Sequence, residues 1–375
     1  MGGCRKPQAN IATMATLKQT VRFCTTRDKV RIAYATMGRG VPLVRTAHFL
    51  THVELDVASP VWIPWLSELS RDHQLVRYDG RNCGLSDRTT MPLSLDTWLA
   101  DLEAVIDAAK LERFSLLGCS QGGAISIAYA ARHPERVSSL VLLGAYARGS
   151  MKRDPTPAQL SEARALLDLV QVGWGRDNPA FRQLFTSLFI PGGTPEQIDW
   201  FNELERLTIS PADAARAMAA FGQIDVTVDA AAIRCPTLVL HALGDARVPY
   251  EEGRRLAGLI PGAHFVSLDS RNHVLLEHEP AFRRCFDEIR AFLHQHGPPQ
   301  GDALAFTDLT KGERALVELM AHGLDNLQIA ARLGLSEKTV RNKVSAVFTK
   351  LEVETRSQAI VRARQAGFAT TPLDS

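Results

Sequence analysis

The sequence predicts an α/β domain followed by a small all-α domain, and three observations support this prediction. Between 21 and 292, apolar runs of strand length alternate with longer amphipathic stretches, a pattern typical of a mostly parallel sheet covered by helices. The alternation stops at 149–233, where the patterns are helical only. A stretch rich in Gly, Pro and polar residues, 294–302, then precedes a tail of short helices.

Strands are expected where aliphatic and β-branched residues form short runs: 30–36, 43–47, 74–78, 114–117, 140–143, 237–241 and 264–268. Helices are expected between strands at 95–108 and 124–132, and within the helical segment at 157–169, 195–207 and 211–221. We therefore expect an N-terminal extension at 1–20, an α/β domain at 21–295 with a lid at 149–233, a linker at 296–306 and an all-α domain at 307–375.

The 375 residues include 43 Lys and Arg against 41 Asp and Glu, a net charge of +2 at pH 7. This balance excludes a protein that binds polyanions over its whole surface, so any contact with nucleic acid must be local. No apolar run approaches the roughly 20 residues of a membrane span, and the first residues lack the apolar core of a secretory signal. We expect no membrane partner.

Six cysteines lie far apart without a C-x-x-C pair. This spacing favours reduced thiols in a cytoplasmic protein over a zinc site or a disulfide framework. The chain also lacks H-E-x-x-H, a P-loop, and G-x-G-x-x-G after a strand. Neither a metal nor a cofactor is expected.

The segment 114–123 reads as a strand that runs directly into Gly118-x-Ser120-x-Gly122 and then into an Ala-rich helix. A serine at such a sharp turn presents its hydroxyl above the edge of the sheet. Larger side chains two positions to either side would collide with neighbouring backbone, and Gly123 lets the helix pack close to the sheet. The motif alone occurs by chance in about one chain in ten of this length, so its position between strand and helix is what makes it informative.

Serine is a weak nucleophile and needs a base, which in turn needs an acid to orient it. Asp245 follows one apolar strand and His273 follows the next, so both belong at the carboxyl edge of the sheet with Ser120. Each has an ordinary alternative, since Asp245 could be a turn residue before Pro249 and His273 a surface histidine. The order Ser, acid, His favours a catalytic triad.

Residues 21–295 resemble the α/β-hydrolase superfamily. The matching features are the G-x-S-x-G turn, the acid and histidine after it, and the segment D-G-R-N-C-G-L-S-D at 79–87, which is similar to the Asp-x-Arg-Gly-x-Gly-x-Ser loop after that family's fourth strand. The resemblance implies an eight-stranded, mostly parallel sheet with a helical lid. It also implies a serine hydrolase for ester or related bonds, with the triad Ser120, Asp245 and His273.

One position departs from the family pattern. Hydrolases of this type commonly have His-Gly after the third strand, where this chain has Ala47-His48. An oxyanion site can still form from the backbone N–H of Gln121 and that of His48 or Phe49, since only backbone groups are required. A side chain in place of glycine is expected to narrow the pocket or rotate the peptide.

The tail contains capping and terminating residues that predict four helices. Thr310 with Glu313, and Thr355 with Gln358, can form capping boxes. Glycines that can end helices follow at 323, 334 and 367.

The third of these helices, from a cap at Ser336 to about Leu351, combines an apolar stripe with a polar face. The stripe consists of Val340, Val344, Val347 and Leu351. The polar face carries Lys338, Arg341, Asn342, Ser345 and Thr349, flanked by Lys343 and Lys350. Such side chains suit phosphates and base edges in a major groove, although a solvated helix face would look similar.

Residues 309–368 resemble the LuxR-type helix-turn-helix over nearly their whole length. The matching segments are L-T-K-G-E at 309–313, G-L-D-N at 323–326, I-A-A-R-L at 329–333, S-E-K-T-V at 336–340, K-L-E-V at 350–353 and R-S-Q-A at 356–359. The resemblance implies a scaffold helix at 326–333 and a recognition helix at 336–351. It implies base contacts by Arg341, Asn342 and Ser345, and phosphate contacts by Lys338, Lys343 (where the family often has His) and Lys350.

The two resemblances together predict a transcription regulator whose hydrolase domain binds a small molecule and is competent to cleave it. Its expected partners are double-stranded promoter DNA, the small-molecule ligand or substrate, and a second copy of the chain, because paired half-sites match two-fold symmetry. One alternative is an esterase-like serine hydrolase with an accessory tail. Another is a receptor without turnover, which the altered oxyanion loop suggests.

Overall fold

The computed structural model describes residues 17–176, 178, 180–298, 306, 309–351, 353–366 and 368–369. Internal contacts divide the chain into two compact units, Met1–His296 and Gly297–Ser375, and each unit is described by itself. Within the described ranges, no helix is both long enough and apolar enough to cross a lipid bilayer.

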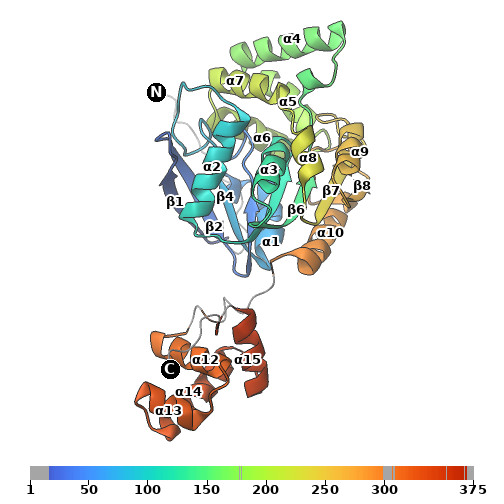
Figure 1. The fold of residues 1–375 in the computed structure, drawn as a ribbon. Helices are drawn as coiled ribbons and strands as arrows, with labels where there is room; N and C mark the ends of the chain where they lie inside the picture. Colours follow the sequence, from blue (N-terminus) through green and yellow to red (C-terminus); the bar gives the residue numbers. More distant parts are fainter. Residues whose placement is uncertain are drawn as a thin grey trace, which may run out of the picture. The chain divides into compact units, whose positions relative to one another are not determined.

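The first unit is built on an eight-stranded sheet with the order β1-β2-β4-β3-β5-β6-β7-β8. Figure 1 shows this sheet among its covering helices. β2 pairs antiparallel with β1 and β4, and the other neighbouring strands are parallel. The strands are β1 (Gln19–Thr25), β2 (Arg31–Met37), β3 (Val41–Arg45), β4 (His73–Tyr78), β5 (Phe114–Cys119), β6 (Val137–Leu143), β7 (Thr237–Ala242) and β8 (His264–Leu268). The predicted fold class is confirmed.

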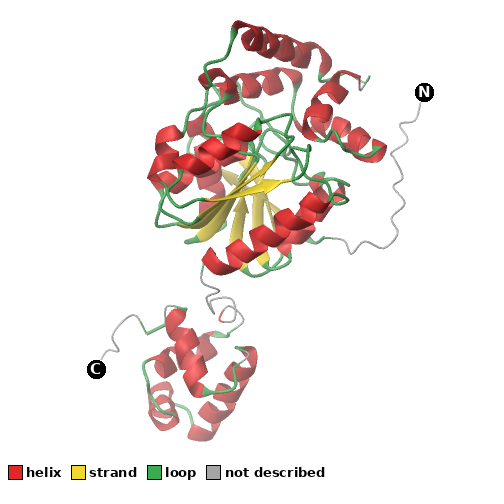
Figure 2. Ribbon diagram, turned by 90° about the vertical axis from the view of Figure 1, so that its right-hand side faces the viewer, coloured by secondary structure: helices red, strands yellow, loops and turns green. Residues whose placement is uncertain are grey.

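Helices cover both faces of this sheet, as Figure 2 shows. One layer contains α2 (Leu95–Ala108), α3 (Gln121–Arg132), α8 (Thr227–Ala232) and α9 (Tyr250–Leu259). The other contains α1 (Trp62–Ser70) and α10 (Pro280–His296), which meet through the rings of Trp65 and Phe286. Because both faces are covered, every residue of β5 and β6 is buried.

Four further helices lie together beyond one end of the sheet (Figure 1). They are α4 (Pro157–Gly173), α5 (Ala180–Phe189), α6 (Pro195–Thr208) and α7 (Pro211–Gly222). Thr156, Thr194 and Ser210 cap α4, α6 and α7 ahead of a first-turn proline, and these helices lie where the sequence analysis expects them. The predicted lid range 149–233 also includes α8, but α8 packs against α3 and α9, so we use the term lid for α4–α7 alone.

The second unit has its own small core. Its helices are α12 (Lys311–Ala321), α13 (Asn326–Leu333), α14 (Glu337–Lys350) and α15 (Arg356–Gln365). Both predicted capping boxes are present, and Gly334 ends α13 in the left-handed conformation. The predicted stripe of α14 is buried, with Val340, Val344, Val347 and Leu351 at most 7% exposed.

Some expectations differ from the structure or lie outside its described part. Strand β1 is an edge strand with many exposed positions, so its residues lack an apolar run, and it begins inside the predicted extension 1–20. Of that extension, 1–16 lie outside the described residues, as does most of the predicted linker 296–306. Helix α10 continues to His296, past the predicted domain end at 295.

Candidate active site and nucleic-acid interface

Ser120 lies at the turn between β5 and α3. Its backbone has φ 52° and ψ −124°, a conformation that costs energy for a residue with a side chain. Three glycines make the turn possible by close approach. A Cβ at Gly118 would lie 2.6 Å from the Cα of Gly123, one at Gly122 would lie 3.0 Å from the carbonyl oxygen of Thr46, and one at Gly123 would lie 2.4 Å from the Cβ of Ala145. The turn therefore has the form that the G-x-S-x-G spacing predicts.

Asp245 and His273 lie beside each other at the ends of β7 and β8. Asp245 Oδ2 accepts a hydrogen bond from His273 Nδ1 over 2.7 Å. Asp245 Oδ1 accepts from the backbone N–H groups of Arg247 and Val248 at 2.8 and 2.9 Å. Burial alone would raise the pKa of Asp245, but the His273 imidazole and these hydrogen bonds outweigh it and lower that pKa. Asp245 is thus a buried carboxylate that orients the imidazole.

Two residues that the sequence analysis did not single out complete this pair. Gly144 follows β6 with φ +56°, and a Cβ there would lie 3.0 Å from His273 Cε1. Only glycine leaves room for the imidazole. His241 also approaches the acid, with Nε2 3.0 Å from the carbonyl oxygen of Val248 and 3.5 Å from Asp245 Oδ2. The position of Gly144, directly after an apolar strand, could have drawn attention to it in the sequence. No sequence signal marks His241.

Ser120 and His273 line the same cavity. The rest of its wall is mainly apolar and comes from the β3–α1 loop, α1, the strand ends and the lid: His48, Phe49, Leu50, Trp62, Trp65, Cys119, Leu143, Phe189, Phe201 and Val274. Its volume is about 30 Å³, enough for an ordered water but not for a ligand. A larger ligand therefore requires the wall of this cavity, part of which is the lid, to move.

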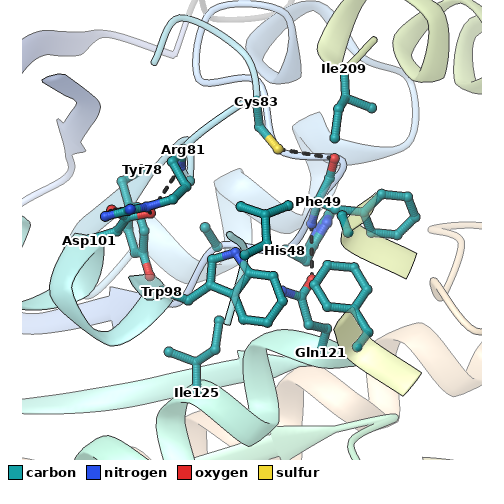
Figure 3. Close-up of a pocket in the computed structure, with 15 residues that line it drawn as sticks. His48, Phe49, Tyr78, Arg81, Cys83, Trp98, Asp101, Gln121, Ile125 and Ile209 are labelled. Carbon is teal, nitrogen blue, oxygen red and sulfur yellow. Dashed lines mark hydrogen bonds and ion pairs between the residues drawn. The ribbon is translucent and has the colours of Figure 1, made fainter. Parts of the chain in front are cut away.

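The predicted oxyanion loop lies against the N-terminus of α3. Gln121, whose N–H is one predicted donor, extends its side chain to this loop, and Oε1 accepts from the N–H of Phe49 over 3.2 Å (Figure 3). Phe49 also lines a second cavity, of about 20 Å³, together with His48, Trp98 and Ile125. One of the two predicted loop donors is therefore already bonded to a neighbouring side chain.

His48, the residue that replaces the usual glycine, lies between two donors, of which a neutral imidazole can accept only one. Arg45 Nη2 is 3.0 Å from His48 Nε2, and the N–H of Leu50 is 3.2 Å from Nδ1. Burial and the Arg45 cation hold the pKa of His48 well below its usual value. The imidazole is therefore neutral beside Ser120.

The predicted DNA-contacting residues gather on the exposed side of α14. Lys338, Arg341, Asn342 and Ser345 are exposed, and Lys343 is partly buried. Arg341 forms an i,i+4 ion pair with Glu337 at 2.9 Å, and Ser345 Oγ donates to the carbonyl oxygen of Arg341. These side chains share one accessible face that suits a major groove.

Lys350 has a different environment from the other predicted phosphate contacts. Its Nζ lies 2.7 and 2.9 Å from the two carboxylate oxygens of Glu313. Glu313 also closes the capping box of α12 by accepting from the N–H of Thr310. The Lys350 hydrogen bonds and the Thr310 N–H lower the pKa of Glu313 to about 2. The cation of Lys350 thus ties α14 to α12.

The described residues contain no group of three or more His, Cys, Asp or Glu side chains suited to hold a metal ion. Cys24, Cys83, Cys119, Cys235 and Cys285 are free thiols, and Cys4 lies outside the described residues.

Comparison with known families agrees with the two units. The model of the alpha/beta hydrolase fold matches residues 53–191. The model of the luxR family of bacterial regulatory proteins matches residues 307–363, which include all of α12–α14.

Individual relatives match the first unit. An AB hydrolase superfamily protein, YisY of Bacillus subtilis, is 31% identical over 205 residues, 54% of this chain and 75% of the relative. The putative carbamate hydrolase RutD of Azorhizobium caulinodans is 29% identical over 246 residues, 64% of this chain and 87% of the relative. An esterase from Exiguobacterium antarcticum superposes with a TM-score of 0.61 at 22% identity, covering 72% of this chain and 98% of that structure. This last likeness concerns the fold.

Proposed function

The chain belongs to the α/β-hydrolase superfamily and carries a regulatory domain of the LuxR family, and from this premise we propose how its two units work. The protein is a DNA-binding transcription regulator. Its hydrolase domain binds a small-molecule ligand under the lid and hydrolyses an ester or related bond in it. Relatives named as hydrolases support hydrolytic activity in general.

One observation carries the catalytic part of the proposal. Ser120 and His273 line one cavity, and His273 is bonded through Nδ1 to the buried carboxylate of Asp245. In this arrangement Nε2 of His273 takes the proton as Ser120 Oγ attacks the carbonyl carbon, and later returns it to the leaving group. Water then hydrolyses the acyl-serine by the same route. The N–H of Gln121 and that of His48 or Phe49 would stabilise the oxyanion.

The regulatory part rests on the second unit and its exposed α14 face. Arg341, Asn342 and Ser345 would read base edges, while Lys338 and Lys343 would bind phosphates. Two copies of the chain would bind two half-sites, and DNA as a partner implies a cytoplasmic location. For the ligand to change DNA binding, it must bind one state of the protein more tightly than another.

Hydrolysis of short-chain p-nitrophenyl esters by the full chain tests the catalytic part. Ser120→Ala should lower kcat/KM by roughly 10³-fold or more. Ser187→Ala is a matched control, because this exposed lid serine only donates to the carbonyl oxygen of Leu184, and it should retain activity. Activity that survives Ser120→Ala, or no turnover of any ester, would contradict a serine hydrolase.

The regulatory part needs a separate experiment, because the Asp245–His273 pair also fits an enzyme with an accessory tail. DNA fragments selected in vitro by the full chain provide the probe. Phenylmethylsulfonyl fluoride, which sulfonylates an activated serine with loss of fluoride and so occupies the site covalently, should change the affinity for these fragments in the wild type but not in Ser120→Ala. Unchanged affinity after complete modification of Ser120 would favour the enzyme with an accessory tail.

A further inference from the structure

Arg45, the last residue of β3, is a buried arginine without an acidic partner. The residue is 2% exposed, and its Nε and Nη1 are buried without a hydrogen-bond partner. Its Nη2 bonds His48 Nε2, its Cζ lies 4.3 Å from the ring centroid of Trp62 in a cation–π contact, and it interacts with the neutral thiol of Cys119. No carboxylate of the described residues forms an ion pair with it.

Two other fully buried arginines, Arg77 of β4 and Arg81 of the loop after β4, are paired. Arg77 bonds Asp56 Oδ2 at 3.0 Å, and Arg81 bonds Asp28 and Asp101, both at 2.8 Å. Burial of a charge is costly unless it is paired and hydrogen-bonded. The nearby carboxylate, Asp56, is already bonded to Arg77, so the charge of Arg45 is not balanced within this part of the chain.

The surroundings of Arg45 connect it to the cavity of Ser120. His48, Trp62 and Cys119 all line that cavity, and the guanidinium contacts the first two and interacts with the thiol of the third. His48 is neutral and adds no negative charge. A second guanidinium, that of Arg247, lies 5.7 Å from the ring centroid of Phe189 on the lid side of the cavity. Two cations thus lie against residues that line the cavity, and the carboxylate of Asp245, bonded to the lining residue His273, is already paired.

We propose that the ligand of the Ser120 cavity carries a carboxylate on an apolar body, with the carboxylate at the end lined by His48 and Trp62, where it balances the charge of Arg45. The inference rests on the proposed function and names its ligand class. The apolar wall accounts for the body, because Leu50, Trp65, Leu143 and Phe201 offer it no polar group. A neutral ligand of the same shape would leave the cation unbalanced and bind more weakly.

A pair of probes of equal shape tests the charge directly. The full-length Ser120→Ala protein, which cannot cleave the probes, is titrated calorimetrically with 3-phenylpropanoate and with 3-phenylpropanamide at pH 7. We expect the acid to bind at least about tenfold more tightly than the amide. Addition of Arg45→Met should bring the two affinities together, whereas Arg45→Lys should keep part of the preference. Arg31→Met, at an exposed arginine paired with Asp87, is the control and should keep all of it.

The outcomes separate this inference from the proposed function. Equal binding of acid and amide by the Ser120→Ala protein overturns the inference, and this comparison does not depend on the folding of any Arg45 variant. A preference that survives Arg45→Met also overturns it. If neither probe binds while ester hydrolysis depends on Ser120, the inference fails alone. If neither probe binds and no ester is cleaved, the proposed function fails with it.

Discussion

The backbone N–H of His273 donates to the carbonyl oxygen of Phe189, the last residue of α5, over 2.9 Å. The N–H of Val274 donates to the same oxygen over 3.1 Å. The loop that carries the candidate base is therefore bonded directly to the lid. Because the closed cavity is too small for a ligand, opening the lid at this edge has to loosen His273 as well. In the proposed function, ligand entry and assembly of the catalytic site would therefore be coupled.

Asn272→Ala should weaken this coupling. The Asn272 side chain accepts from the N–H of Gly192 at 2.8 Å and donates to Glu279 at 3.2 Å, so its loss removes a side-chain tie between lid and loop. We expect a loss of about 1–2 kcal/mol of unfolding free energy and faster amide hydrogen exchange at 189–193. Arg271→Ala is the control, because that side chain reaches the carbonyl oxygen of Pro191 only at 3.4 Å. Equal exchange rates in the two variants would contradict a lid held by Asn272.

His48→Asn should change how stability depends on pH. The pKa of His48 is lowered by burial and by Arg45, so below its unfolded pKa of about 6.5 only the unfolded state takes up the proton. Stability from this group is present above that pH and is lost as the pH falls. From pH 6.5 to 5.5 the wild type should lose about 1 kcal/mol more than His48→Asn. Urea unfolding at both pH values measures the difference, and parallel losses would contradict a neutral His48. His52, His73 and His241, whose pKa values are also lowered by burial, remain in both proteins and largely cancel.

Local spacing explains why so much of the fold was predictable. The turn at Ser120 needs glycines at fixed offsets because backbone approaches there within 3 Å, so the motif carries its own geometry. Helices α12 and α15 begin at capping boxes whose two partners lie three residues apart, so these signals are also local. The roles of Ser120, Asp245 and His273, and of the DNA-contacting residues, stay predictions.

The features that the sequence analysis missed depend on contacts between distant segments. Gly144 is needed because of His273, and Lys350 is paired with Glu313 37 residues away. A glycine after an apolar strand is at most a local hint of the first relation, and nothing in the chain marks the second. Strand β1 was missed for a different reason, since an edge strand with exposed positions lacks the apolar run by which the inner strands were found.

Lys350→Gln should affect the second unit more through stability than through DNA binding. The Lys350 ammonium bonds both oxygens of Glu313, so the variant leaves a carboxylate beside the capping box of α12 without this partner. We expect the second unit to melt at a lower temperature than in the wild type. Binding to the selected DNA should weaken more for Lys338→Gln, since that lysine is exposed. For this variant, the slope of log affinity against log salt concentration should fall by about one, the amount expected for one lost phosphate contact. A salt dependence that falls as much for Lys350→Gln would show that Lys350 leaves Glu313 to bind DNA.

Gln121→Met should raise the catalytic rate. Gln121 Oε1 occupies the N–H of Phe49 at 3.2 Å, one of the two loop groups that could bind the oxyanion, so a substrate oxygen has to displace the amide. Methionine keeps the length of the side chain and removes this competing acceptor. Since one oxyanion donor is worth about 10²–10³ in rate, we expect kcat for p-nitrophenyl acetate to rise by roughly tenfold.

Gln121→Glu is the matched variant for this prediction. A carboxylate accepts the Phe49 N–H more strongly than an amide does, and its charge would oppose the developing oxyanion, so kcat should fall. A lower kcat in both variants would mean that the Gln121 amide supports the oxyanion site, and that His48 rather than Phe49 supplies the loop donor. In that case His48, at a position where related enzymes have glycine, would contribute its backbone N–H to catalysis while its imidazole contacts Arg45.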